Sequence, residues 1–132
     1  MKQLTLQLPL SPSINHYWKH TVYANKVHTY ISKEGVAFRQ EVQKIYCNYL
    51  LMLRINGSRE YPFIFFPEER LEVNIEIYPH RLGFDIDNRI KAAQDAMQYA
   101  GVYKDDRQID KLVVERKEKT KDGKMIATIK SL

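Results

Sequence analysis

The sequence has almost no cysteine and no long apolar run, and each lack excludes a class of protein. Cys47 is the only cysteine among 132 residues, which excludes an intramolecular disulfide and argues against a cysteine-based zinc site. The longest apolar runs cover only a few residues, so no segment is predicted to span a membrane. Residues 1–6 are too few and too polar for a secretory signal, and we therefore expect a cytoplasmic protein.

The composition is that of an ordinary globular domain with a basic balance of charge. Apolar residues make up 44% of the chain and charged residues 28%, and 132 residues suffice for one core but not comfortably for two. We therefore expect a single domain over 1–132. The 21 Lys and Arg side chains outnumber the 16 Asp and Glu, which gives a formal net charge of +5. This excess favours an anionic partner but does not by itself identify nucleic acid.

Hydrophobic periodicity predicts a mixed α/β (α+β) fold, with a small mixed sheet of about four strands and two main helices. Alternating apolar residues indicate strands, and apolar residues three and four apart indicate helices. The predicted strands cover 4–8, 71–78, 109–117 and 125–130, and the predicted helices run from Lys33 to Arg54, after a Ser32 N-cap, and from Asp87 or Asn88 to Gly101. Asp122-Gly123 is typical of a hairpin turn before the last strand.

Two segments show no clear period. Residues 11–30 mix prolines, histidines and aromatics, and we interpret them as a long, ordered surface loop, a kind of loop that is often functional. In the segment Asn56–Arg70, residues 56–58 end the long helix and residues 59–70 are aromatic and proline-bearing. This second segment either packs over the core or forms part of a subunit interface.

Acidic residues flank the second predicted helix. Asp85-Ile86-Asp87 precedes it, Asp105-Asp106 follows it, and Lys91 lies four residues after Asp87, on the same helical face. Carboxylates are hard ligands for Mg²⁺, and a lysine beside them can stabilise a phosphate. The alternative is structural, with Asp87 as a cap, an ordinary ion pair to Lys91, and a turn at Asp105-Asp106. Two acidic pairs on a cationic chain favour the metal interpretation, because clustered carboxylates repel one another unless a cation lies between them.

The length of this helix raises a geometric question. About 13 helical residues span roughly 20 Å, so an ordinary strand–helix–strand crossover would place Asp85 and Asp106 at opposite ends of the sheet. Either the chain after Gly101 doubles back, or Asp106 meets Asp85 and Asp87 of a second subunit. The residues alone leave both arrangements open.

Basic and aromatic residues outside the acidic stretch are candidate nucleic-acid contacts. The loop at 11–30 interleaves aromatic rings, which can stack on unpaired bases, with cations that can hold phosphates. The alternatives are a loop whose aromatics anchor it to the core and, at 111–130, a solvated charged face that keeps the protein soluble. The candidate contacts are Asn15, Tyr17, Lys19, Arg81, Arg89, Lys117 and Lys119.

Taken together, these motifs resemble the RusA family of Holliday junction resolvases, which is common in phages and prophages. The similar segments are Leu8-Pro9-Leu10-Ser11-Pro12-Ser13-Ile14-Asn15-His16-Tyr17-Trp18, the helix start at residues 32–39, and the ordered series Asp85-Ile86-Asp87-Asn88, Lys91-Ala92-Ala93, Asp95-Ala96, Ala100-Gly101 and Asp105-Asp106. The ordered series is far more specific than the D-x-D pair alone.

The resemblance implies a homodimeric, structure-selective endodeoxyribonuclease that depends on Mg²⁺, with Mn²⁺ as a substitute, and uses no small-molecule cofactor. It would cut four-way DNA junctions in recombination and repair. Carried over by position, its catalytic acids and metal ligands fall on Asp85, Asp87 and Asp106, and its catalytic lysine on Lys91; Asp105 lies outside the set.

Two other functions stay open. One is a non-catalytic, dimeric protein that binds branched DNA, in which the aspartates are caps and turns. The other is a nuclease of related fold that acts on flaps or single strands. Metal-dependent strand scission and a panel of DNA substrates separate the three.

Overall fold

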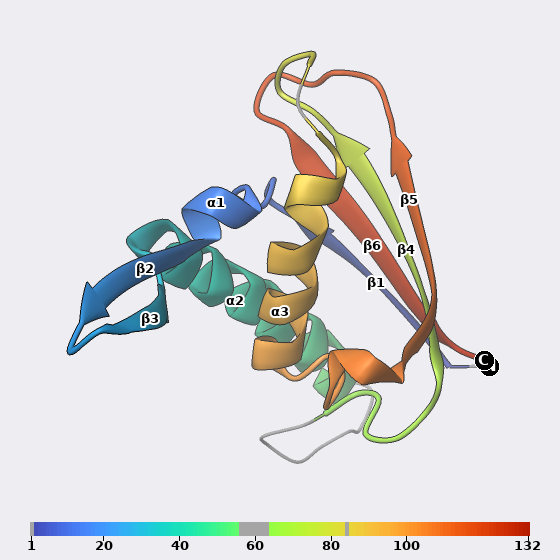
Figure 1. Cartoon of the computed structure of the whole chain (residues 1–132). Coiled ribbons are helices and arrows are strands. Elements are labelled where there is room, and N and C mark those ends of the chain that lie inside the picture. Colours follow the sequence, from blue (N-terminus) through green and yellow to red (C-terminus); the bar gives the residue numbers. More distant parts are fainter. Residues whose placement is uncertain (1, 56–63, 84) are drawn as a thin grey trace.

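A computed structural model describes residues 2–55, 64–83 and 85–132 and shows two helices packed on one face of a four-stranded sheet (Figure 1). No helix within these residues is both long and apolar enough for a membrane span. In chain order the elements are β1 (Gln3–Leu8), α1 (Ile14–Tyr17), β2 (Trp18–Tyr23), β3 (Lys26–Ile31), α2 (Lys33–Ile55), β4 (Leu71–Tyr78), the 3-10 turn η1 (Asp87–Arg89), α3 (Ile90–Ala100), the 3-10 turn η2 (Asp106–Gln108), β5 (Ile109–Arg116) and β6 (Lys124–Ser131).

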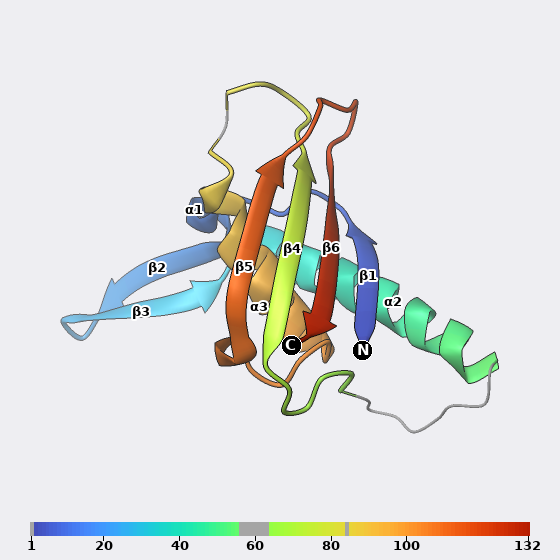
Figure 2. The same ribbon diagram turned by 90° about the vertical axis from the view of Figure 1, so that its right-hand side faces the viewer.

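The main sheet is mixed, with strand order β1-β6-β4-β5 (Figure 2). The strand β4 pairs in parallel with β5, while β6 runs antiparallel to both β4 and β1. This confirms the expected mixed sheet and its four strands. The predicted hairpin at Asp122-Gly123 is wrong, because β4 lies between β5 and β6. The turn itself exists, since Gly123 has a positive φ of 73°, but it joins strands that are not neighbours.

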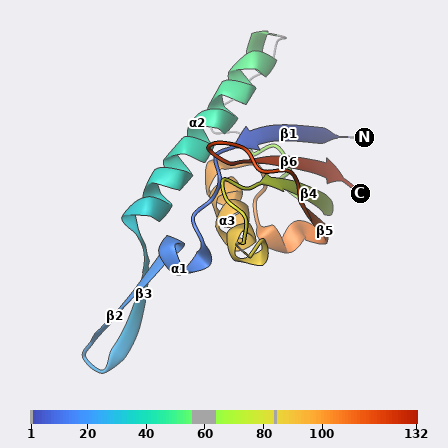
Figure 3. The same cartoon turned by 90° about the horizontal axis from the view of Figure 1, so that it is seen from above.

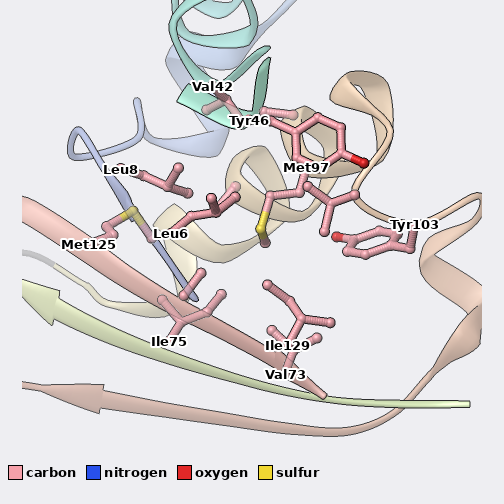
Figure 4. Packing of buried hydrophobic residues seen from close by; sticks show 14 of the residues in the cluster. Leu6, Leu8, Val42, Tyr46, Val73, Ile75, Met97, Tyr103, Met125 and Ile129 are labelled. Carbon is pink, nitrogen blue, oxygen red and sulfur yellow. The ribbon is translucent and has the colours of Figure 1, made fainter. Parts of the chain in front are cut away.

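The core lies between the sheet and the helices α2 and α3 (Figure 4). Alternate residues of β1, β4 and β6 point into it, as the burial of Leu6, Ile75 and Ile129 shows. Val42 and Tyr46 of α2 and Met97 of α3 close it from above, and all three are fully buried. The period-2 and period-3.6 patterns of the sequence therefore identify the correct inward faces.

The helix boundaries follow their capping residues. Ser32 caps α2, because its Oγ accepts a hydrogen bond from the Gly35 amide at 2.9 Å. The helix α3 ends at Gly101, whose φ of 105° is the left-handed conformation that favours glycine. Both predicted helices are thus confirmed, with η1 forming the tighter first turn before α3.

The prediction of a long surface loop at residues 11–30 is wrong. The segment forms α1 and the β2–β3 hairpin, here called the arm (residues 18–31), which projects from the body of the protein (Figure 3). Its tip carries positive φ at Ala24 (53°) and Asn25 (60°), the requirement of a two-residue type I′ turn. The sequence shows no apolar alternation in these strands, because the arm is largely exposed and only Trp18 and Ile31, at its base, pack against the core.

Residues 56–63 of the segment Asn56–Arg70 lie outside the described residues. The prediction that residues 56–58 end the long helix therefore lies outside them too. The described part, 64–70, packs on the core. Phe65 and Phe66 are buried, and the Phe66 amide donates to the Val102 carbonyl at 3.0 Å. This segment therefore supports the chain that leaves α3.

Candidate active site

The turn that carries Asp87 is held to the N-terminal loop by a reciprocal pair of hydrogen bonds. The buried Ser11 donates its hydroxyl to the Arg89 carbonyl at 2.6 Å, and the Arg89 guanidinium donates to the Ser11 carbonyl, also at 2.6 Å. Asp85 and Asp87 remain exposed, with the Asn88 amide 3.4 Å from an Asp85 oxygen. Two carboxylates are thus presented to solvent from a turn whose backbone is fixed.

Lys91 and Asp106 lie together although 15 residues separate them. The Lys91 ammonium is 3.1 Å from Asp106 Oδ2, and both side chains retain solvent access. The Asp106 amide also donates to the Gln98 side chain at 2.9 Å, which places the residue alongside α3. The chain after Gly101 therefore returns along α3 and brings Asp106 to Lys91. This contact does not by itself bring Asp106 to Asp85 and Asp87, so both arrangements considered from the sequence stay open.

Gln108 organises the turn on which Asp106 sits. Its buried side-chain oxygen accepts from the amides of Lys104 at 3.0 Å and Asp105 at 2.9 Å. Its side-chain nitrogen donates to the carbonyls of Phe66 at 3.0 Å and Glu69 at 2.9 Å. One side chain thus satisfies four backbone groups from two segments and fixes the position of η2.

Asp105 has the role of a cap. Its carboxylate accepts from the Arg107 amide at 2.9 Å, and the Gln108 side chain completes the reciprocal capping box. Hydrogen bonds from the Arg107 guanidinium and backbone lower the pKa of Asp105 to about 2. This agrees with leaving Asp105 outside the ligand set.

The carboxylates of Asp85, Asp87 and Asp106 have the right chemistry for a hard divalent cation, which prefers oxygen ligands. Within the described ranges 2–55, 64–83 and 85–132, however, no three His, Cys, Asp or Glu side chains are grouped so as to hold one. Asp106 contacts Lys91, while Asp85 and Asp87 stand at the start of the helix. The donors are therefore present in one chain without being gathered there.

A half-buried cluster of Tyr17, Arg39 and Asp95 was not predicted from the sequence. Arg39 of α2 donates to Asp95 of α3 at 2.8 Å and to the Tyr17 hydroxyl at 2.9 Å, and Tyr17 also bonds to Asp95. Burial, followed by the bond to Asp95, raises the pKa of Tyr17 well above its usual range. The only signal in the sequence is a charged residue on each helix among positions that otherwise face the core.

The predicted nucleic-acid contacts lie in several places. Asn15 and Lys19 are exposed at the base of the arm, Arg81 is exposed before the acidic turn, and Lys119 is exposed after β5. Lys117 forms ion pairs with Glu76 at 3.4 Å and Glu115 at 2.9 Å.

Two of the predicted contacts have internal roles. Tyr17 is fully buried, and Arg89 is half-buried against Ser11. Burial, with a smaller contribution from Arg81, lowers the pKa of Arg89.

The family model described as "Endodeoxyribonuclease RusA" matches residues 9–130. A protein of Shigella sonnei (strain Ss046) is 33% identical over 130 residues, and one of Escherichia coli (strain K12) is 32% identical over 130 residues. A protein of Enterobacteria phage 82 is 34% identical over 130 residues.

Each alignment covers 98% of this chain and 95% of the relative. All three relatives are named crossover junction endodeoxyribonuclease RusA. The aligned region therefore takes in nearly the whole fold. This chain belongs to the RusA family of endodeoxyribonucleases.

Proposed function

We propose that this protein is a structure-selective endodeoxyribonuclease that cuts four-way DNA junctions, acting in the cytoplasm in recombination and repair. Family membership over nearly the whole chain supports the reaction class. The observation that carries the proposal is the 3.1 Å contact between Lys91 and Asp106, which joins two residues of the expected catalytic set across 15 positions. The exposed Asp85 and Asp87 stand at the start of the same helix.

In this proposal Lys91 is the cation that faces the scissile phosphate. Its ammonium is half-exposed and has Asp106 as a partner, so it is oriented by a carboxylate yet open to an anion. When a phosphate oxygen gains negative charge, a positioned N–H donor stabilises the transition state more than the ground state. The two hydrogen bonds between Ser11 and Arg89 tie the turn that carries Asp87 to the N-terminal loop.

Asp85, Asp87 and Asp106 are the residues proposed to hold Mg²⁺, with Mn²⁺ as a substitute. When bound, such an ion supplies Lewis-acid activation of the attacking water and of the phosphate. Asp106 completes the ligand set either within one chain or across a homodimer. A twofold dimer would present two sites to a junction of approximate twofold symmetry.

The DNA contacts proposed are those predicted side chains that the fold leaves exposed: Asn15, Lys19, Arg81 and Lys119. Lys117 is a weaker candidate, because two glutamates already neutralise it. These groups would contact phosphates and unpaired bases, which positions a junction without requiring a long recognition sequence.

The first test is cleavage of a synthetic four-way junction with Mg²⁺ and with EDTA, against duplex, flap and single-stranded controls. Paired incisions that need the metal and favour the junction support the proposal. Tight binding without incision in Mg²⁺ or Mn²⁺ would favour the non-catalytic branched-DNA binder, and preferred cutting of flaps or single strands would change the substrate.

Variants then assign the residues. Asp85→Asn, Asp87→Asn and Asp106→Asn should each abolish cleavage while junction binding persists, and Asp122→Asn in the turn before β6 is the matched control. Loss of binding together with cleavage would indicate structural roles. A mixed dimer of the Asp85 and Asp106 variants regains activity only if a site is shared between subunits.

A further inference from the structure

A hollow of about 390 Å³ lies at the base of the arm, and neither the acidic turn nor Lys91 belongs to it. Its volume falls within the range of small-molecule sites, about 300–1,000 Å³. The lining residues are Ile14 and Asn15 of α1, Trp18 and His20 of β2, and Thr29 of β3.

The arm supplies one side of the hollow through the period of its strands. Trp18 and His20 are two residues apart and share a face of β2, and Thr29 is the cross-strand partner of His20. A hydrogen bond of 3.0 Å between His20 Nδ1 and Thr29 Oγ1 fixes the imidazole in its place. The side chains on this face are therefore held before any ligand arrives.

Trp18 is the aromatic surface of the hollow, and the body of the protein holds it. Tyr17 packs edge-on against its indole, with ring centroids 5.2 Å apart and planes at 83°. The Arg39 guanidinium lies 5.9 Å from the same ring, and Arg39 is itself anchored by Asp95. The indole is thus supported from the core yet still lines the hollow.

The charges and polar groups around the hollow indicate which kind of ligand would fit it. None of the five lining residues is acidic, and the arm from 18 to 31 contains two lysines and two histidines but no Asp or Glu. The exposed Asn15 amide offers one donor group and one acceptor, the pair that can read the edge of a base. A flat aromatic ring attached to an anionic backbone meets all of these requirements.

We propose that the hollow binds one unstacked nucleobase of the DNA, stacked on Trp18 and contacted at its edge by Asn15. The proposal rests on the function proposed above, since a four-way junction in its open form has bases at the exchange point that lack a stacking neighbour on one side. The helix α1, which supplies Asn15, packs against η1 and α3. A base held there would therefore fix the strand relative to the turn that carries Asp87.

The chain offers a direct probe, because Trp18 is its only tryptophan. Intrinsic fluorescence should be quenched when a junction is titrated in EDTA, where no cleavage interferes, and a duplex of equal length should quench it much less. Junctions with abasic residues at the exchange point should still bind, as measured by anisotropy of a labelled strand, but should lose the quenching. Quenching that persists with the abasic junctions overturns the proposal.

Substitutions give a second readout. Trp18→Ala should weaken junction binding by roughly 5- to 150-fold, the range for losing one base–aromatic stack. Trp18→Phe keeps an aromatic ring and should retain most of the wild-type affinity. Tyr30→Ala, which removes an exposed aromatic of the same arm outside the hollow, is the matched control. Melting curves of each variant verify the fold.

The two proposals fail in different ways. A junction that binds without any change in Trp18 emission, and is cut normally, overturns the base site and leaves the nuclease intact. A junction that the wild-type protein neither binds nor cuts overturns both.

Discussion

Gln108 gives the sharpest test of how the site is built. The Gln108→Ala variant would remove four hydrogen bonds that lie between 2.9 and 3.0 Å, from a side chain only 7% exposed. Each is worth about 0.5–1.5 kcal/mol net, and water can reach part of the opened turn, so we expect a loss of about 2–4 kcal/mol. For a domain of this size that corresponds to a melting temperature lower by roughly 10 °C.

The assay has two parts. Urea unfolding measures the free energy of unfolding, and junction cleavage at a temperature well below the transition measures whether Asp106 keeps its place. Cleavage by the folded variant should fall, because η2 loses its ties to Phe66 and Glu69. Gln40→Ala on the exposed side of α2 is the control and should change stability by less than about 0.5 kcal/mol. A Gln108→Ala protein as stable and active as wild type would refute the reasoning.

Three further results are expected. Arg39→Leu should cost about 1–3 kcal/mol in urea unfolding, less than for a fully buried pair, and adding Asp95→Asn should recover part of it; no recovery would contradict the coupling. The depressed pKa of Asp105, about 2 against an ordinary 3.8, means that its stabilisation is present above pH 4 and is lost as the pH falls toward 2. Arg107→Ala should flatten the dependence of unfolding free energy on pH in that window, and an unchanged slope would argue against this pairing. Lys91→Met should reduce the cleavage rate by about 10²–10³-fold with little change in junction binding, and a selective loss of binding would assign it to substrate capture.

Periodicity predicted the body of the fold because its faces are asymmetric. The alternation in β4 and the apolar stripe of α2 each mark a side that must be buried, so their bounds differ from the prediction by a residue or less. The strands of the arm have no such asymmetry, and the sequence pattern therefore predicts a loop there. Strand order is a property of the whole sheet, so a local turn signal at Asp122-Gly123 could not reveal that β4 separates β5 from β6.

Some residues of the candidate site could also be grouped from the sequence, and others could not. Asp85, Asp87 and Lys91 are close in sequence, and their spacing was sufficient to group them. The approach of Asp106 depends on Gln98 and Gln108, whose side chains bond to backbone groups that no motif specifies. Sequence spacing could not predict the cluster of Tyr17, Arg39 and Asp95 either, because three separate elements contribute to it.

The position of β6 has a consequence for the order in which the chain can fold. The strand β1 pairs with β6, with Gln3 opposite Lys130. The strand that is made first can therefore pair only after the strand that is made last. During synthesis the inward leucines of β1 have no sheet to join until nearly all of the chain has emerged, and such distant pairings are slow to form. Because β6 also separates β1 from β4, a chain that stopped before residue 124 would lose the centre of the sheet rather than its margin. The strand β6 is therefore the link that joins β1 to β4, whereas β4 pairs with β5 without it.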